Sequence, residues 1–91
     1  MRFEWDRAKA EMNLRKHGVS FDDALHVFAD PFRLDEPDFR ADYGESRRLT
    51  MARIDGRLHV MAYTMRGDVV RLISARKANE REQRRYGAAQ G

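Results

Sequence analysis

Three strand-like segments joined by two very short turns constrain the fold of this chain most. Residues 48–54 and 58–65 flank an Asp-Gly step at 55–56, and such a step between apolar runs is a strong hairpin signal. Residues 69–75 follow a second short turn at 66–68. The segments therefore predict an antiparallel meander, which is stable only when one face packs against helices.

Two helices are predicted before the meander. Asp6 is a good N-cap for a run of helix formers, and Gly18 is well placed to end that helix. Ser20 then begins a second helix, which the Asp30-Pro31 step ends.

One further helix is predicted after the meander. Asn79 as N-cap and Glu82 at the third helical position match a capping box. The helix is expected to run to about Tyr86, with Gly87 as its stop.

The remaining segments are less regular. Residues 3–5 alternate and predict a short edge strand, while residues 32–46 predict an acidic loop with a short strand at 32–34. The fold class is therefore α+β in a single domain over residues 1–91. It has two amino-terminal helices, a small antiparallel sheet and a carboxyl-terminal helix.

Strand alternation assigns the side chains of the last strand to two faces. Because successive residues of a strand point to opposite sides, alternation over residues 69–75 puts Arg71 and Ala75 on one face. It puts Leu72 and Arg76 on the other. The pattern leaves open which face is solvent-exposed.

Charge is distributed unevenly along the chain. The net charge is +3, but residues 21–45 carry two basic against eight acidic groups, whereas residues 66–91 carry seven basic against three acidic groups. The local balances are thus −6 and +4. A basic carboxyl-terminal surface favours an anionic polymer as partner, and the acidic middle is expected to face elsewhere.

Several classes of protein and site are disfavoured. The chain has no cysteine, no apolar leader and no run long enough to span a membrane, so we expect a cytoplasmic protein with no membrane contact. His17, His26 and His59 lack metal-ligand spacing. No phosphate loop, dinucleotide fingerprint or serine nucleophile elbow is present. We therefore expect neither a metal nor a cofactor.

The residue inventory suits metal-free RNA cleavage. Attack of a 2′-hydroxyl on the adjacent phosphorus needs a base, an acid and cations for the charge of the transition state. Arginine suits the cationic role because its planar fork binds two phosphate oxygens. The available side chains are Arg66, Arg71, Arg76, Lys16, His17, His59 and Tyr86.

Each of these side chains also has a structural interpretation. Arg71 can pair across strands, and Arg66 can serve as a turn residue. Lys16 and His17 can complement the dipole at a helix carboxyl end, and the Tyr86 ring can pack beneath the last helix.

Two separated motifs resemble the BrnT toxin family over nearly the whole chain. The opening motif consists of Trp5-Asp6, Lys9, Asn13, Lys16-His17-Gly18-Val19-Ser20-Phe21, Ala24, Phe28 and Asp30-Pro31. The closing motif consists of Arg66-Gly67, Arg71, Ile73-Ser74-Ala75-Arg76, Ala78, Glu82 and Tyr86. Arg7 stands where the family often has proline.

The resemblance implies a RelE-like fold and a type II toxin–antitoxin system. In such a system the toxin is an endoribonuclease that arrests translation. A BrnA-like antitoxin neutralises it and contacts operator DNA, which the toxin reaches only indirectly. For an RNA substrate we assign phosphate and transition-state charge to Arg76 and Arg71, assisted by Arg66. Lys16 or His17 would supply acid–base function.

The other site residues are assigned on the same basis. Tyr86 would stack or transfer a proton, and RNA backbone contacts are expected from Lys77, Arg81, Arg84 and Arg85. The acidic loop is a candidate surface for a basic antitoxin segment. The main alternative is a non-catalytic module that binds RNA or protein and acts as a co-repressor subunit.

Overall fold

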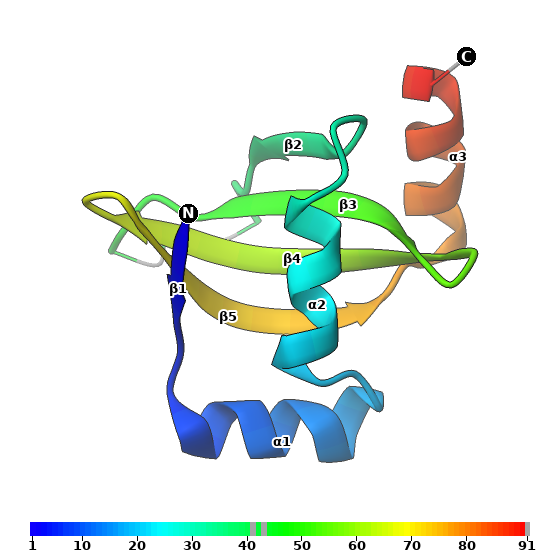
Figure 1. The fold of residues 1–91 in the computed structure, drawn as a ribbon. Helices are drawn as coiled ribbons and strands as arrows, with labels where there is room; N and C mark the ends of the chain where they lie inside the picture. Colours follow the sequence, from blue (N-terminus) through cyan, green and yellow to red (C-terminus); the bar gives the residue numbers. More distant parts are fainter. Residues whose placement is uncertain (41, 43, 91) are drawn as a thin grey trace.

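A computed structural model describes residues 1–40, 42 and 44–90 (Figure 1). The elements in chain order are β1 (Arg2–Glu4), α1 (Arg7–His17), α2 (Phe21–Phe28), β2 (Leu34–Pro37), β3 (Arg48–Ile54), β4 (Arg57–Arg66), β5 (Val69–Lys77) and α3 (Glu80–Gln90). The sheet order is β1-β5-β4-β3-β2. This confirms the α+β class and the meander.

The sheet is larger than the predicted meander and is mixed. β1 pairs in parallel with β5, whereas β2 pairs antiparallel with β3. The strand expected at 32–34 begins at Leu34 and runs to Pro37 instead. In this position Asp35 and Glu36 lie opposite Thr50 and Leu49 of β3.

The predicted turns and caps are confirmed. Asp55 and Gly56 have positive φ of 51° and 79°, the backbone of a tight hairpin. Asp6, Ser20 and Asn79 side chains accept hydrogen bonds from backbone N–H groups of the helices that follow.

One predicted helix end is wrong. α3 continues through Gly87 to Gln90, because one glycine inside a helix costs only about 1 kcal/mol relative to alanine. The Gln90 side chain then donates to the Phe32 carbonyl at 2.8 Å, which ties the helix end to the segment before β2.

Strict alternation along β5 is also wrong, because the β4–β5 ladder contains an irregularity. Ala62 pairs with Ser74 and Tyr63 with Leu72, so Ile73 is an extra residue. Beyond it Arg76 lies opposite Val60, and before it Arg71 lies opposite Thr64. Val60 and Thr64 are an even number of residues apart and share one face of β4. Arg71 and Arg76 therefore lie on the same face of the sheet.

The main core fills the face covered by α2, which lies across the middle strands in Figure 1. Its buried members include Phe21, Val27, Met61, Tyr63 and Leu72. The three ring contacts at this core are edge-to-face, among them Phe28 with Tyr63 at 5.2 Å, an arrangement that aromatic pairs prefer.

Asn13 attaches α1 to the β5 side of the sheet. Its Nδ2 donates to the Ala75 and Val19 carbonyls at 2.8 and 3.0 Å, and its Oδ1 accepts from the Ala75 N–H at 3.1 Å. The amide side chain therefore pairs with Ala75 as a neighbouring strand would. This explains why a polar residue is the buried one on α1.

The opposite face of the sheet has a smaller core. α3 packs at one end of it through Tyr86, against a cluster that includes Leu58 and Val60. Ladder pairing places Arg66, Arg71 and Arg76 on this face, which we call the arginine face.

Candidate functional site

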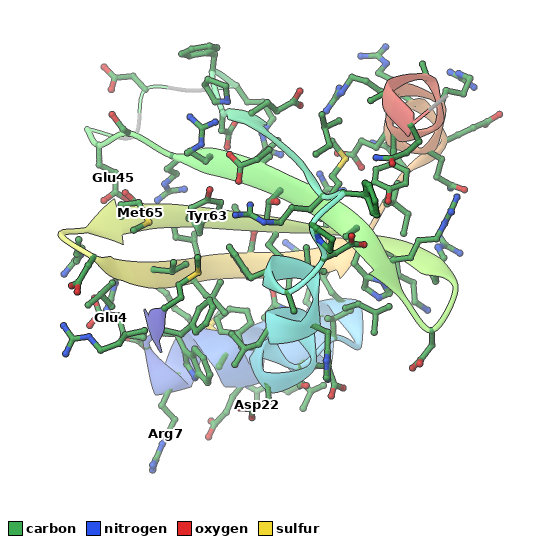
Figure 2. All side chains as sticks on the ribbon, turned by 45° about the horizontal axis from the view of Figure 1, so that its top comes forward. Glu4, Arg7, Asp22, Glu45, Tyr63 and Met65 are labelled. Atoms are coloured by element: carbon green, nitrogen blue, oxygen red, sulfur yellow. The ribbon has the colours of Figure 1, made fainter. Side chains whose placement is uncertain are left out.

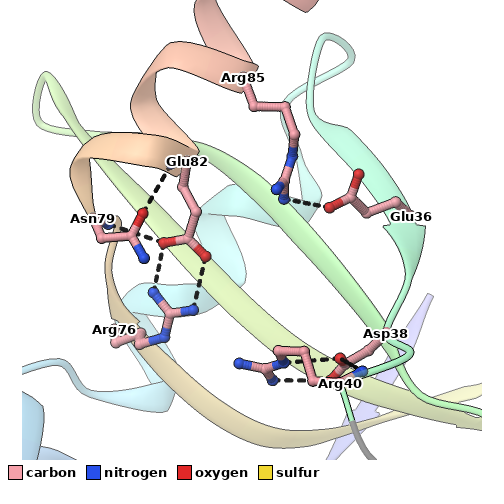
Figure 3. Close-up of polar contacts among 7 residues, drawn as sticks. All are labelled: Glu36, Asp38, Arg40, Arg76, Asn79, Glu82 and Arg85. Atoms are coloured by element: carbon pink, nitrogen blue, oxygen red, sulfur yellow. Dashed lines mark hydrogen bonds and ion pairs between the residues drawn. The ribbon is translucent and has the colours of Figure 1, made fainter.

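A groove of about 630 Å³ opens between α3, β2 and the end of β5 (Figure 3). We call it the arginine groove, because four arginines line it. The residues that line it include Glu36, Asp38, Phe39, Arg40, Arg76, Asn79, Arg81, Glu82 and Arg85.

Arg76 is held in the groove by a two-pronged ion pair with Glu82. Its Nη1 and Nη2 atoms lie 2.7 and 2.8 Å from the two carboxylate oxygens. Glu82 also accepts from the Asn79 backbone N–H at 2.9 Å, while the Asn79 side chain accepts from the Glu82 N–H at 2.8 Å. The capping box thus fixes the carboxylate that orients Arg76.

The charge of Glu82 is stabilised despite burial. The carboxylate side chain is only 8% exposed. Burial raises the pKa of Glu82, but the hydrogen bonds from Arg76 and the Asn79 backbone outweigh it, and the pKa lies below its ordinary value. Glu82 therefore stays ionised and keeps Arg76 in place.

Arg40 is fixed by a turn on the other side of the groove. Asp38 accepts from the Arg40 backbone N–H and from Nε and Nη2 at 3.1, 2.8 and 2.9 Å. These bonds hold the pKa of Asp38 below its ordinary value. The Asp38 N–H donates to the Arg47 carbonyl at 2.8 Å, so the turn is anchored to the start of β3.

Arg85 bridges two elements at the upper side of the groove in Figure 3. From α3 it donates to Glu36 on β2. Arg81 also lines the groove. Among the groove residues that the structure describes, it is the arginine without an ion pair. The four arginines against Glu36, Asp38 and Glu82 give the groove a formal charge of 4 − 3 = +1.

A second hollow, of about 840 Å³, lies where β3 begins and β4 ends, and Asp42 and Glu45 are among its lining residues. Arg47, Arg48 and Arg66 line it, and Figure 2 shows Glu45 and Met65 close together there. Pro37, Asp38 and Phe39 border both this hollow and the arginine groove. We call these three residues the 37–39 ridge.

The structure brings together only part of the predicted site. Arg76, Arg81 and Arg85 line the arginine groove, whereas Arg66 lines the second hollow. Arg71 shares their face and lies 3.6 Å from Glu4. These arginines therefore belong to one surface but to separate parts of it.

The predicted acid–base residues lie elsewhere. Lys16 and His17 line a third hollow, between α1 and the Ile73–Ser74 irregularity of β5. Tyr86 is 5% exposed beneath α3, with the Arg53 guanidinium 5.4 Å from its ring centroid. The Tyr86 ring is therefore packed under the helix, as its structural interpretation predicts.

The last two predicted RNA contacts lie outside the groove lining. Lys77 is exposed at the end of β5. Arg84 pairs with Glu80 at 3.1 Å and its side chain is 68% exposed.

Sequence reasoning missed the contribution of the 32–46 segment. Glu36, Asp38 and Arg40 supply one wall of the groove. The Asp-x-Arg spacing at 38–40, which suits a side chain bonding the backbone two residues on, is the signal that predicts such a turn. Arginines inside and outside this segment neutralise most of its acidic side chains. Its paired carboxylates, each bound to an arginine of the chain, are Asp35, Glu36, Asp38 and Glu45.

Asp35 forms a separate polar cluster on the α2 side of the sheet. It accepts from Tyr63, Arg48 and Arg33. Burial raises the pKa of Asp35, but these hydrogen bonds outweigh it and the pKa lies below its ordinary value. Burial and the Asp35 contact raise the pKa of Tyr63. The cluster joins β2, β3 and β4 and has a structural role.

No helix in residues 1–40, 42 and 44–90 is long and apolar enough to cross a membrane. Within the same residues, no three His, Asp or Glu side chains gather as a metal site would require.

Clustered arginines along one sheet face of a small α+β protein favour an anionic polymer as its partner. Comparison with known families narrows this class of partner. The family described as "Ribonuclease toxin, BrnT, of type II toxin-antitoxin system" matches residues 5–82. The chain therefore belongs to the BrnT family of ribonuclease toxins, whose substrate is RNA and whose partner is an antitoxin. No curated protein matches the chain.

Proposed function

We propose that this toxin is a metal-independent endoribonuclease that cuts RNA in the arginine groove and thereby arrests translation. We also propose kinship with RelE-like toxins and neutralisation by a BrnA-like antitoxin. The observation that carries the proposal is the convergence of Arg40, Arg76 and Arg85 on one groove, each oriented by a carboxylate.

Phosphate binding is the first task of the groove. The ion pair with Glu82 occupies two hydrogen-bonding positions of Arg76, and a guanidinium has further N–H donors. A donor that is already oriented loses little entropy when a phosphate oxygen arrives. Arg76 therefore binds the scissile phosphate, and Arg81 supplies the uncompensated charge beside it.

Glu36 is the proposed base. Its side chain is 32% exposed, against 8% for Glu82 and 0% for Asp38, so it is the most accessible carboxylate of the groove. It takes the proton of the 2′-hydroxyl as the 2′ oxygen bonds to phosphorus. The bond to the 5′ oxygen then breaks, that oxygen leaves towards Arg81, and it takes a proton from water. Glu36 gives its proton to the hydroxide that remains and is ionised again. The products are a 2′,3′-cyclic phosphate and a 5′-hydroxyl.

The activity is tested with purified, antitoxin-free protein and single-stranded RNA in EDTA. Cleavage with 2′,3′-cyclic phosphate ends is expected. Intact RNA with folded protein contradicts the proposal. If the RNA stays intact but the protein still binds RNA or its antitoxin, the result supports the alternative, a non-catalytic RNA- or protein-binding co-repressor.

The roles of the groove residues are separated by variants. Arg76→Lys keeps a charge but loses the fork, so cleavage is expected to fall roughly 100-fold or more. Glu36→Gln is expected to lower kcat with little change in KM. Arg7→Ala, which removes an exposed arginine of α1 outside the described groove lining, is the matched control and should cut normally. Full activity of Arg76→Lys removes Arg76 from the site.

Lys16 and His17 are tested in the same assay. Their predicted acid–base role requires the third hollow to take part in cleavage, and Lys16→Ala with His17→Ala would then lower kcat. Unchanged cleavage by this double variant, with loss in Glu36→Gln, assigns proton transfer to the arginine groove.

Neutralisation is tested by expressing the chain alone and with its neighbouring antitoxin gene. Expression alone is expected to stop translation and growth, and co-expression is expected to restore both. Growth arrest that the antitoxin gene leaves unrelieved contradicts the proposed pairing.

A further inference from the structure

We infer that the RNA strand crosses the 37–39 ridge and that one of its bases stacks on Phe39. This inference rests on the proposed function and deepens it, because it assigns a base-binding position next to the groove where cleavage occurs.

The exposure of Phe39 is the first observation. At 87% it is the most exposed of the large hydrophobic side chains described in this structure. Burying a phenylalanine normally stabilises a small domain, so a ring left in solvent contributes little to the fold. Its removal is therefore expected to leave stability nearly unchanged.

The second observation is that a rigid turn presents this ring. The neighbour on one side, Asp38, has a fully buried side chain and a backbone bond to the start of β3. The neighbour on the other side, Arg40, is held by the same carboxylate at three atoms. Phe39 thus sits between two fixed residues, and little backbone freedom is lost when a ligand contacts it.

The third observation is that arginines line the hollows on both sides of the ridge. Arg40, Arg76, Arg81 and Arg85 line one hollow, while Arg47, Arg48 and Arg66 line the other together with Asp42 and Glu45. A polyanion that contacts both sets of arginines must pass over Phe39. Aromatic side chains beside arginine-lined grooves are a means by which proteins bind single-stranded nucleic acid without reading its sequence.

This path also gives a role to Arg66. Arg66 shares the face with Arg76 but lies in the second hollow, too separate to act on the same phosphate group. On a strand that crosses the ridge, Arg66 binds a phosphate outside the cleavage position. Loss of Arg66 should therefore raise KM more than it lowers kcat.

The test uses the full chain, a short single-stranded RNA and four variants, each shown to fold like the parent chain. Phe39→Ala is expected to weaken RNA binding roughly 5- to 150-fold, from the usual contribution of one stacked base. Phe39→Trp should retain binding, whereas Phe39→Leu, which keeps apolar bulk but no ring, should behave like alanine. Phe32→Ala is the matched control, since Phe32 is 71% exposed but lines neither hollow as described.

The outcomes separate the inference from the proposed function. Normal cleavage and RNA binding by Phe39→Ala overturn stacking while leaving the ribonuclease intact. Binding by Phe39→Leu equal to that of the parent chain also overturns it, because the contact is then merely apolar. Loss of antitoxin binding with unchanged RNA binding assigns the ridge to the protein partner and overturns it as well. A parent chain that neither binds nor cuts RNA contradicts the proposed function itself.

Discussion

The two faces of the sheet differ in the kind of side chain that they carry. The face under α2 is filled by apolar and aromatic side chains such as Met61 and Phe21, which are almost fully buried. The arginine face carries a smaller core and arginines that are fixed by carboxylates. Apolar burial stabilises without direction, whereas a paired arginine contributes less stability but holds a defined orientation. One face therefore holds the fold together, and the other presents charge.

The largest effect on stability is expected from the apolar face. Met61→Ala removes a fully buried side chain and is expected to lower the free energy of unfolding by about 2–5 kcal/mol. Chemical denaturation measures it. Met65→Ala, at a half-exposed position on the same strand, is the control. Equal losses for both variants would show that the burial of Met61 is not the source of the loss.

The next effect is expected at the edge between the faces. Asn13→Ala deletes three buried hydrogen bonds and leaves the Ala75 backbone groups without this partner. An unfolding loss of about 1–3 kcal/mol is expected. Hydrogen exchange at the Ala75 amide should quicken more than at Met61, in the middle of the sheet. Unchanged protection at Ala75 contradicts the strand-like role of Asn13.

On the arginine face, Glu82→Gln is expected to cost about 1–2 kcal/mol at neutral pH, because it weakens both the cap and the Arg76 pair. The folded-state pKa of Glu82 is lowered. Its contribution is therefore present above the unfolded pKa of about 4.3, and it is lost as pH falls through the folded pKa.

The measurement is the difference in unfolding free energy between the parent chain and Glu82→Gln as pH is lowered from 7. The difference should shrink on acidification. A difference that stays constant down to the lowest pH at which the chain folds shows that ionised Glu82 is not the source.

The smallest effect is expected at the outer side of α3. Arg84 pairs with Glu80 one turn earlier, and both side chains are largely exposed. Arg84→Ala is expected to change the unfolding free energy by less than about 0.5 kcal/mol, measured by thermal unfolding. A larger loss would mean that pairing alone, without burial, stabilises the arginine face.

Local signals predicted most of the elements. The Asp55-Gly56 turn and the caps at Asp6, Ser20 and Asn79 were predicted correctly, because each depends on residues within three or four positions of one another. The continuation of α3 past Gly87 was not predicted. The weak local preference against glycine is outweighed by the helix around it.

The candidate site was predicted only in part, because its walls come from distant segments. Arg76 and Arg81 were named from the strand–helix junction, but Glu36 and Arg40 join them only when β2 pairs with β3 and faces α3. No spacing along the chain indicates that contact. The sequence also gives no sign that Lys16 and Arg76 line different hollows.

The sequence by itself determined the meander, the three helices, their amino-terminal caps and an arginine-rich carboxyl-terminal half. Only the tertiary structure decided which arginines lie together. The extra residue at Ile73 turns Arg76 to the same face as Arg71, and strand pairing brings the 36–40 segment next to Arg76. Both depend on register between strands, and register is set by long-range packing rather than by neighbours in sequence.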